Sequence, residues 1–148
     1  MKRYASNSAL AHAFATYQSY EGKGNNMFFK GSTIFSYGMH FPIATRVDEL
    51  TFFNVNNYSN TTAKHKGLVR SAISGDNIIE CNYPPTIGEI EYNLLDKAHE
   101  KNLGYWERNV ARLTAEIENP RTRNKATRQA EIAKLEANRN AYKKYFNL

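Results

Sequence analysis

The stretch NYPPT, residues 82–86, divides the chain into two parts of different character. Two consecutive prolines fit the interior of neither a helix nor a strand, so they act as a stiff joint. Before them the sequence is rich in Gly, Asn and aromatic residues, and after them it is charged and periodic. We therefore predict two domains, residues 1–83 and residues 84–148.

The first part has the pattern of a small α+β domain. Helices are predicted over residues 7–18 and from about Thr61 to residue 74, because apolar residues recur there at helical spacing. Asn7 or Ser8 can cap the first helix, and Asn60 or Thr61 the second. The segment EGKGNN, residues 21–26, is predicted to be a flexible loop. Strands are predicted within residues 27–38, 41–47, 49–59 and 75–82. The expected fold of this part is a small antiparallel sheet with two helices.

The second part predicts a long antiparallel helical hairpin. A helix is expected from about Thr86, and its apolar residues from Leu103 to Ile117 alternate steps of three and four, as in a coiled coil. The proline in ENPRTRN ends this helix, and a second helix is expected over residues 126–146. Its apolar seam has the same spacing, with Arg139 as one charged misfit. The predicted fold class is thus α+β, with the hairpin following the small sheet domain.

The composition favours an anionic partner. The net charge is +6 and the isoelectric point is about 9.4. Nucleic acid, an acidic protein surface or a membrane surface would each suit this charge. Cys81 is the only cysteine, so no intrachain disulfide is possible, which fits a reducing compartment. The N-terminus is a poor signal peptide and no apolar run has the ~18–20 residues of a membrane helix, so we expect a soluble, cytoplasmic protein.

A first group of reactive side chains lies in SYGMHFP, residues 36–42. Gly38 can adopt a positive φ, and a tight bend there would bring Tyr37 and His40 together beside Ser36. A neutral histidine can give or take a proton near pH 7. The alternative is structural, with Tyr37 in the core and His40 capping a turn.

A second group lies in YSNTTAKHK, residues 58–66, with Arg70 beyond it. Free backbone amides and hydroxyls at the start of a helix can hold a phosphate or another anion. The side chains suited to this are those of Ser59, Thr61, Thr62, Lys64, His65, Lys66 and Arg70. The alternative is an ordinary helix cap followed by solvated lysines.

The two groups predict a shared pocket if the helix start packs beside the turn. Two histidines with a lysine could then cleave RNA by acid–base catalysis without a metal, using His40, His65, Tyr37 and Lys64. Neither histidine has a carboxylate near it in sequence, so we expect no metal site and no cofactor. Cys81 is expected to be a strand residue rather than a catalytic thiol.

The connection between the two C-terminal helices forms a third group. Arg121, Arg123, Lys125 and Arg128 have no acidic residue between them. At the end of a hairpin they would form a basic knob that contacts phosphates, which sets affinity rather than sequence preference. A solvated loop is the alternative.

The segments SYGMHFPIA and YSNTTAKH resemble paired motifs, SYGxHFPIA and YSxTTxxH, of a family of small uncharacterised phage and mobile-element proteins. The upstream NNMFFKGSTIF is also similar to that family, and the resemblance covers residues 7–75. It implies a mobile-element origin and a shared role for Tyr37, His40, Ser59, Thr61, Thr62 and His65. No catalytic residue or activity is carried over from the resemblance.

Three functions remain open at this point. The favoured one is a non-enzymatic binder of nucleic acid, RNA above all, or of a host nuclease ribonucleoprotein in the host cytoplasm. An inhibitor of host antiviral defence, such as an anti-CRISPR protein, would fit this description. The second is a metal-independent nuclease or nucleotide-processing enzyme that uses His40 and His65. The third is a structural homo-oligomer formed through the hairpin.

Overall fold

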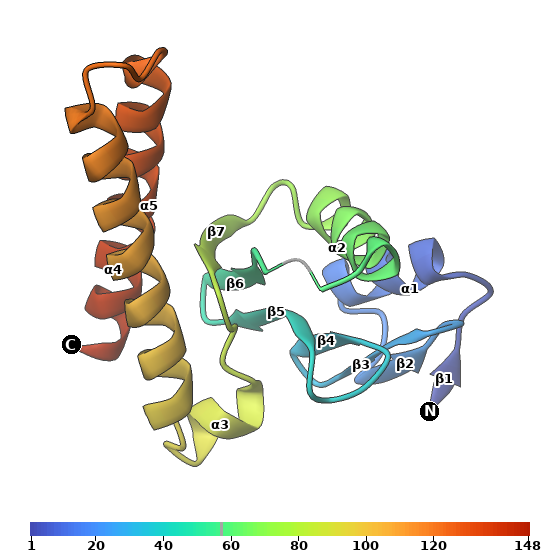
Figure 1. Ribbon diagram of the computed structural model, residues 1–148. Helices are drawn as coiled ribbons and strands as arrows, with labels where there is room; N and C mark the ends of the chain where they lie inside the picture. Colours follow the sequence, from blue (N-terminus) through green and yellow to red (C-terminus); the bar gives the residue numbers. More distant parts are fainter. Residues whose placement is uncertain (57) are drawn as a thin grey trace. The chain divides into compact units, whose positions relative to one another are not determined.

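The computed structural model describes residues 1–56 and 58–148, which form two compact units, residues 1–95 and residues 96–148 (Figure 1). Within these residues the strands are β1 (Lys2–Arg3), β2 (Glu21–Lys23), β3 (Met27–Lys30), β4 (Thr33–Ser36), β5 (Pro42–Val47), β6 (Leu50–Asn54) and β7 (Asn77–Cys81). The helices are α1 (Asn7–Ala15), α2 (Asn60–Ala72), α3 (Ile87–Glu91), α4 (Asp96–Glu118) and α5 (Lys125–Phe146).

The sheet of the first unit combines two kinds of strand pairing. Its strands lie in the order β1 to β7, and β2 to β6 form an antiparallel meander. The two outer pairs, β1 with β2 and β6 with β7, are parallel. Parallel neighbours need a crossover connection, and here α1 joins the first pair and α2 joins the last.

The crossovers explain where the two helices lie. β1 and β6 point the same way in the sheet, and both crossovers step toward the strand with the higher number. Because such crossovers are nearly always right-handed, both helices fall on the same face. There α1 and α2 pack against each other and against the sheet, and Figure 1 shows them side by side. The core beneath them includes Leu10, Phe14, Met27, Ile34, Phe53 and Val69.

Serine and threonine caps set the starts of the helices in the first unit. The Ser6 hydroxyl accepts from the backbone amide of Ala9, and the Ser59 hydroxyl accepts from that of Thr62. Both caps lie one residue or more before the residues that the sequence favoured. Thr86 and Glu89 form a capping box at the start of α3.

Arg46 on β5 fixes the end of α1 to the sheet. Its guanidinium donates to the carbonyl oxygens of Phe14 and Ala15 and pairs with Asp76 at 3.1 Å. The guanidinium also stacks over the Tyr17 ring, 4.2 Å from its centroid. Cationic side chains stabilise helix C-termini because the last carbonyls lack partners within the helix.

In the second unit α4 and α5 run antiparallel. Near one end Arg128 pairs with Glu116 at 2.9 Å, and near the other the His99 Nδ1 atom and the Tyr142 hydroxyl lie 2.6 Å apart. Trp106 and Tyr142 are fully buried, with ring centroids 5.2 Å apart. Trp106 and Tyr142 belong to the predicted seams of the two helices, whereas Glu116, Arg128 and His99 do not.

The fold class predicted from the sequence is wrong. The described chain carries a seven-stranded mixed sheet and five helices, rather than a small antiparallel sheet with two helices followed by a hairpin. β1 and β2 were missed, because they are two and three residues long and carry no apolar alternation. Residues 21–23 of the predicted loop are strand β2. The predicted strand over residues 49–59 is confined to β6, and its position 57 lies outside the described residues.

The helix expected from Thr86 is two helices. α3 ends at Glu91, and Asn93 has a φ of 54°, a left-handed conformation that interrupts the helix before α4. The amide of Ile87 donates to the Thr33 hydroxyl of β4, so α3 contacts the sheet. The first unit therefore extends past the predicted boundary at Tyr83.

None of the helices in the described chain combines the length and apolarity needed to cross a membrane.

Candidate functional site

The two sequence motifs meet at Ser36 and His65. Ser36 is the last residue of β4, and His65 lies on the buried face of α2 together with Thr62 and Val69. The Ser36 hydroxyl and the His65 Nδ1 atom are 2.7 Å apart, and the two residues are only 1% and 3% exposed. A polar group buried this deeply needs a hydrogen-bond partner, and each supplies the other's.

Asn7 determines which nitrogen of His65 carries the proton. The Asn7 side-chain oxygen accepts from the backbone amide of Asn25, which can only donate. The Asn7 amide nitrogen must therefore be the group that donates to the Asn26 side chain at 2.7 Å and faces His65 Nε2 at 3.5 Å. Since two donors would repel, Nε2 is the bare nitrogen and Nδ1 carries the hydrogen. His65 thus donates to Ser36 and does not accept its proton.

Burial also keeps His65 neutral. Removal from water lowers the pKa of this imidazole below its ordinary value, because the charged form loses hydration. A neutral Nδ1–H tautomer cannot take the Ser36 proton through Nδ1, so the arrangement differs from a serine–histidine nucleophile. The pair instead anchors the end of β4 to α2.

Tyr37, next in the chain, has an unusual backbone conformation. Its φ is 62°, in the left-handed region that a bulky residue rarely adopts. Hydrogen bonds on both sides hold the turn: Ser36 donates to the Phe41 carbonyl, Tyr37 to that of Asn26, and Phe41 to that of Gly38. Gly38, expected to take the positive φ, does not, so the strain falls on the tyrosine. Strain of this kind often marks a functional position.

The Tyr37 side chain reaches solvent while staying linked to the buried pair. Its ring centroid is 5.5 Å from that of His65, and its hydroxyl accepts from the Asn26 amide at 3.3 Å. Even so, the residue is 57% exposed. The network from Asn7 through His65 therefore holds an exposed aromatic ring at a fixed place.

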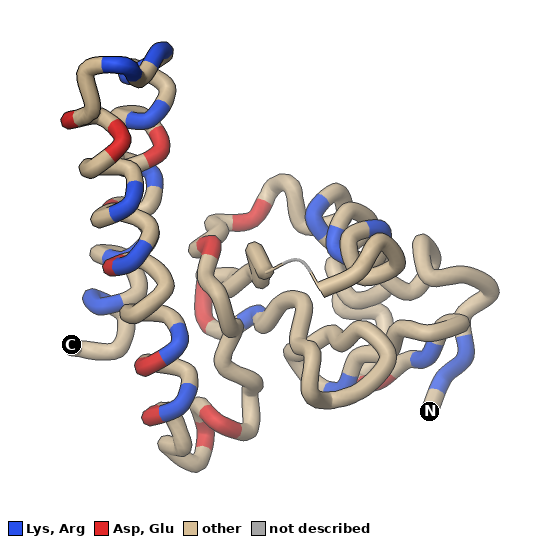
Figure 2. The backbone as a smooth tube through the Cα atoms, viewed as in Figure 1, with Lys and Arg blue, Asp and Glu red and all other residues tan. Residues whose placement is uncertain are grey.

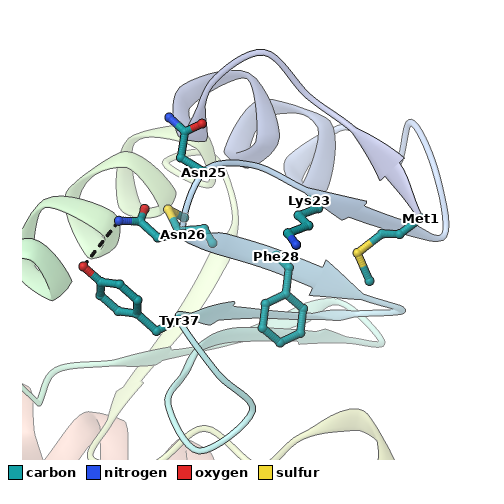
Figure 3. A pocket seen from close by; sticks show the side chains of 7 residues that line it. Met1, Lys23, Asn25, Asn26, Phe28 and Tyr37 are labelled. Carbon is teal, nitrogen blue, oxygen red and sulfur yellow. Dashed lines mark hydrogen bonds between the residues drawn. The ribbon is translucent and has the colours of Figure 1, made fainter.

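That ring borders a pocket of about 450 Å³ (Figure 3). The polar and aromatic lining comes from Lys23, Asn25, Asn26, Phe28 and Tyr37, and Met1 and Met27 complete it. Lys23 and Asn25 are exposed and Phe28 is half-buried. Two aromatic rings can stack on a flat ligand, two carboxamides can donate and accept hydrogen bonds, and the lysine ammonium can hold an anion.

The structure brings together some residues of the predicted pocket but not others. Ser36, Tyr37 and His65 meet as expected. His40 is exposed and its ring folds back over Gly38 in the turn. Ser59 and Thr62 bond each other in the cap of α2, Thr61 is half-buried and Lys64 is exposed. The two imidazoles expected to work as a pair therefore lie in different surroundings, one buried and one exposed.

The cations expected on α2 are engaged in the fold to different degrees. Lys66 is buried, and its ammonium donates to the Asn56 carbonyl at 3.0 Å. Burial lowers the pKa of this lysine, an effect that Glu80 partly offsets. Arg70 is exposed, with its guanidinium 6.0 Å from the Phe53 ring centroid. Cys81, the last residue of β7, is fully buried. Its burial raises the pKa of the thiol, which keeps the thiol unreactive.

Sequence reasoning missed Asn7, Lys23, Asn25, Asn26 and Phe28 as site residues. Asn7 was considered only as a helix cap, and the asparagine pair only as part of a loop. A signal was present in the asparagine pair itself, because asparagine favours turns, and the structure places the pair in the turn between β2 and β3. Its link to Tyr37 depends on strand pairing, which the sequence does not reveal.

The basic connection between α4 and α5 is a separate feature. Figure 2 shows Lys and Arg gathered around this connection. Residues 96–148 contain 12 Lys/Arg and 7 Asp/Glu, a net charge of +5, whereas residues 1–95 contain 8 and 7, a net charge of +1. With the observed boundary, most of the positive charge belongs to the helical unit.

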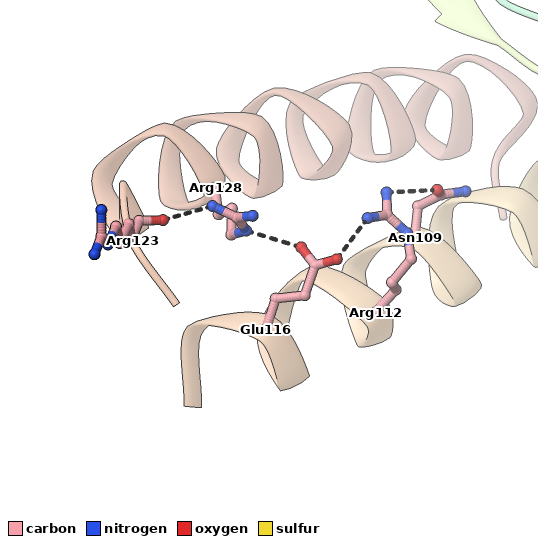
Figure 4. Close-up of polar contacts among 5 residues, drawn as sticks. All are labelled: Asn109, Arg112, Glu116, Arg123 and Arg128. Atoms are coloured by element: carbon pink, nitrogen blue, oxygen red, sulfur yellow. Dashed lines mark hydrogen bonds and ion pairs between the residues drawn. The ribbon is translucent and has the colours of Figure 1, made fainter. Parts of the chain in front are cut away.

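Only part of the predicted basic knob is available to a partner. Arg128 donates to Glu116 and to the Arg123 carbonyl, so it braces the connection (Figure 4). Glu116 also pairs with Arg112, and hydrogen bonds, first of all from Arg128, lower the pKa of this carboxyl. The side chains of Arg121 and Arg123 are exposed and that of Lys125 is half-buried.

Comparison of the chain with protein-family models, curated proteins and solved structures finds no match. The similarity to the paired motifs of mobile-element proteins therefore stays a prediction. Among the residues that the structure describes, no group of three or more His, Cys, Asp or Glu side chains could hold a metal ion.

Proposed function

We propose that the protein is a non-catalytic binder of single-stranded nucleic acid, RNA in preference to DNA. The observation that carries the proposal is the exposed Tyr37 ring, held in a strained turn at the edge of a pocket that also contains Phe28, Lys23 and two asparagines. Proteins that hold single strands combine aromatic rings, on which bases stack, with cations that follow the backbone.

Each part of the pocket has a role in this proposal. A base stacks on Tyr37, and the Asn25 carboxamide is available to its hydrogen-bonding edge, while Asn26 bonds Asn7 and keeps the Tyr37 hydroxyl in place. Lys23 pairs with the adjoining phosphate. The pocket volume of about 450 Å³ lies in the range that takes a small ligand, and one nucleotide is of that size.

The neutral, buried His65 supports binding rather than catalysis. Acid–base chemistry needs a group that can exchange a proton with the substrate, whereas both ring nitrogens of His65 face protein groups. In this proposal its contribution is rigidity, because a ring that is already in place loses less entropy when the ligand binds. A host ribonucleoprotein is the protein partner considered from the sequence. Such a partner would supply single-stranded RNA through the exposed part of its guide RNA.

The test measures binding of short labelled single-stranded RNA and DNA by fluorescence anisotropy. Replacing Tyr37 by Ala removes the stacking partner, which is worth ~1–3 kcal/mol per base, so RNA affinity should fall about 5- to 150-fold. Tyr37→Phe keeps the ring and should retain most of the affinity. Tyr92→Ala is the matched control, because Tyr92 is exposed but lies outside the pocket. Equal affinity of the Tyr37→Ala and Tyr92→Ala proteins would refute the proposal.

A further inference from the structure

One face of the α4–α5 hairpin has an apolar groove that the nucleic-acid proposal does not use. The groove has a volume of about 400 Å³ and is lined by Leu103, Glu107, Val110, Ala111, Arg139 and Lys143. All of these residues belong to the second unit. Its apolar lining comes from Leu103, Val110 and Ala111 of α4. Its charged lining is acidic on α4 and basic on α5.

Heptad spacing explains why the hairpin leaves this groove. Trp106 and Leu113, seven residues apart, are buried. Leu103, Val110 and Ile117 form a second stripe with the same spacing, and all three remain partly exposed. Two helices that pack along one line can cover only the first stripe. The second stripe is the kind of seam that further helices cover in a four-helix bundle.

We infer that this groove is a self-association surface, in which α4 of one copy packs antiparallel to α5 of a second copy, about a two-fold axis parallel to the helices, to complete a four-helix bundle. The inference goes beyond nucleic-acid binding and does not depend on it. A two-fold axis places α4 of each copy against the groove of the other, so the same patch is used twice. The exposed stripe on α4 is then covered from both sides.

Charge favours a second copy as the occupant. Glu107 lies on the α4 wall, and Arg139 and Lys143 lie on the α5 wall. In the two-fold arrangement, Glu107 of one copy faces Arg139 and Lys143 of the other, and the reciprocal contact forms at the same time. An unrelated acidic or basic partner would satisfy only one wall and leave like charges facing on the other.

Packing of the whole hairpin face, in which the groove is the apolar centre, would bury the area of a specific dimer interface. A helix of 23 residues, the length of α4, spans about 35 Å, and two adjacent helices are about 20 Å wide. Such a face offers about 700 Å² per copy, or ~1,400 Å² in total, which lies within the range of specific interfaces.

Sedimentation equilibrium of the full chain over a series of concentrations tests the inference. The wild-type mass should approach twice the 17.0 kDa of one chain. Val110→Lys places a charge in the seam and should give the monomer mass. Glu107→Lys should weaken dimerisation about tenfold, and adding Lys143→Glu in the same chain should restore it. Glu118→Lys is the matched control, because Glu118 is exposed on α4 outside the groove.

Circular dichroism of each variant separates loss of association from loss of folding. A wild-type chain that stays at 17.0 kDa at every concentration overturns the inference. So does a dimer that Val110→Lys and Glu107→Lys leave unchanged, because another surface would then be responsible. A chain that is monomeric alone but forms a one-to-one complex with a different protein through the groove also overturns it.

Discussion

His65 donates from Nδ1 to the hydroxyl of Ser36 over 2.7 Å, which joins residues 29 positions apart in the chain by a buried hydrogen bond. The bond ties the end of β4 to α2, and it holds Tyr37, the next residue, in its left-handed conformation at the surface. The exposed ring is thus supported by the most deeply buried polar contact between the two motifs.

Removing the Ser36 hydroxyl should destabilise the protein. Ser36→Ala leaves the His65 Nδ1–H buried without an acceptor, which costs ~1–3 kcal/mol of unfolding free energy. Urea denaturation followed by circular dichroism measures the loss. Ser8→Ala is the control, because Ser8 is exposed on α1, and it should stay within about 0.5 kcal/mol of wild type. Equal stability of the two variants would show that the bond contributes nothing.

The tautomer of His65 can be observed directly. The Asn7 amide nitrogen opposite Nε2 predicts that the hydrogen is on Nδ1. Long-range proton–nitrogen NMR correlations distinguish the two neutral tautomers. Asn7→Asp replaces the donor with an acceptor and should move the hydrogen to Nε2. A wild-type spectrum of the Nε2–H form would contradict the assignment.

Two histidines, the buried His65 and the half-buried His99, predict a loss of stability in weak acid. Burial lowers the pKa of His65 and of His99 from their ordinary value of 6.5, while Asp96 opposes the shift at His99. The unfolded chain therefore binds protons more readily than the folded chain. The stabilisation is complete above the ordinary pKa and is lost as the pH falls toward the lower folded values.

Urea denaturation at about pH 7.5 and pH 5.5 tests this dependence. Carboxyl groups titrate mostly below this pH range, so they should add little to the difference. The unfolding free energy should be lower at the more acidic pH. The double variant His65→Asn/His99→Asn should show a flatter dependence. An unchanged slope in the double variant would assign the effect to other groups.

Arg46 should be among the most sensitive positions of the first unit. Its side chain is 12% exposed, bonds two carbonyls at the end of α1 and pairs with Asp76. Arg46→Ala removes the donor to the Ala15 carbonyl and leaves Asp76 with Thr51 but no cation, so it should cost about 2–4 kcal/mol in thermal or urea denaturation. Arg46→Lys retains the charge but not the planar fork, so its cost should be intermediate. A lysine variant as damaging as the alanine variant would show that the charge itself contributes little.

The arginines at the α4–α5 connection should separate into two classes. Arg121→Ala/Arg123→Ala removes two exposed cations, and the slope of log affinity for single-stranded RNA against log salt should become shallower by about 1.4. Arg128→Ala should instead lower the melting temperature by removing the brace to Glu116. A salt slope unaffected by the double variant would exclude this connection from binding.

Part of this fold could be predicted from the sequence, because neighbouring residues determine it. The capped helices α1 and α2 and the helix over residues 126–146 follow from side-chain periodicity and capping, whereas the two prolines lie inside the first unit and do not mark its end. The signal for each of these helices lies within a few consecutive residues. The meeting of Ser36 and His65 was expected only on the condition that the start of α2 packs beside the turn.

The rest depends on contacts between distant residues. Lys2–Arg3 becomes a strand only by pairing with β2, and β6 pairs parallel with β7 only because α2 crosses the sheet between them. Tyr37, rather than the neighbouring Gly38, takes the positive φ because Asn26 and Phe41 hold the turn. Arg128 belongs to the predicted basic knob by sequence, but its partner Glu116 comes from the preceding helix.

The two crossovers at the ends of the sheet have a consequence for the order of folding. The meander from β2 to β6 joins strands that follow one another in the chain, so its loops close at small entropic cost. The bond between Ser36 and His65 must await docking of α2 across this meander. In a partly folded chain with only the hairpins formed, the bond that supports Tyr37 is missing. The proposed binding of a ligand at this ring should therefore require that the β6–α2–β7 connection has folded.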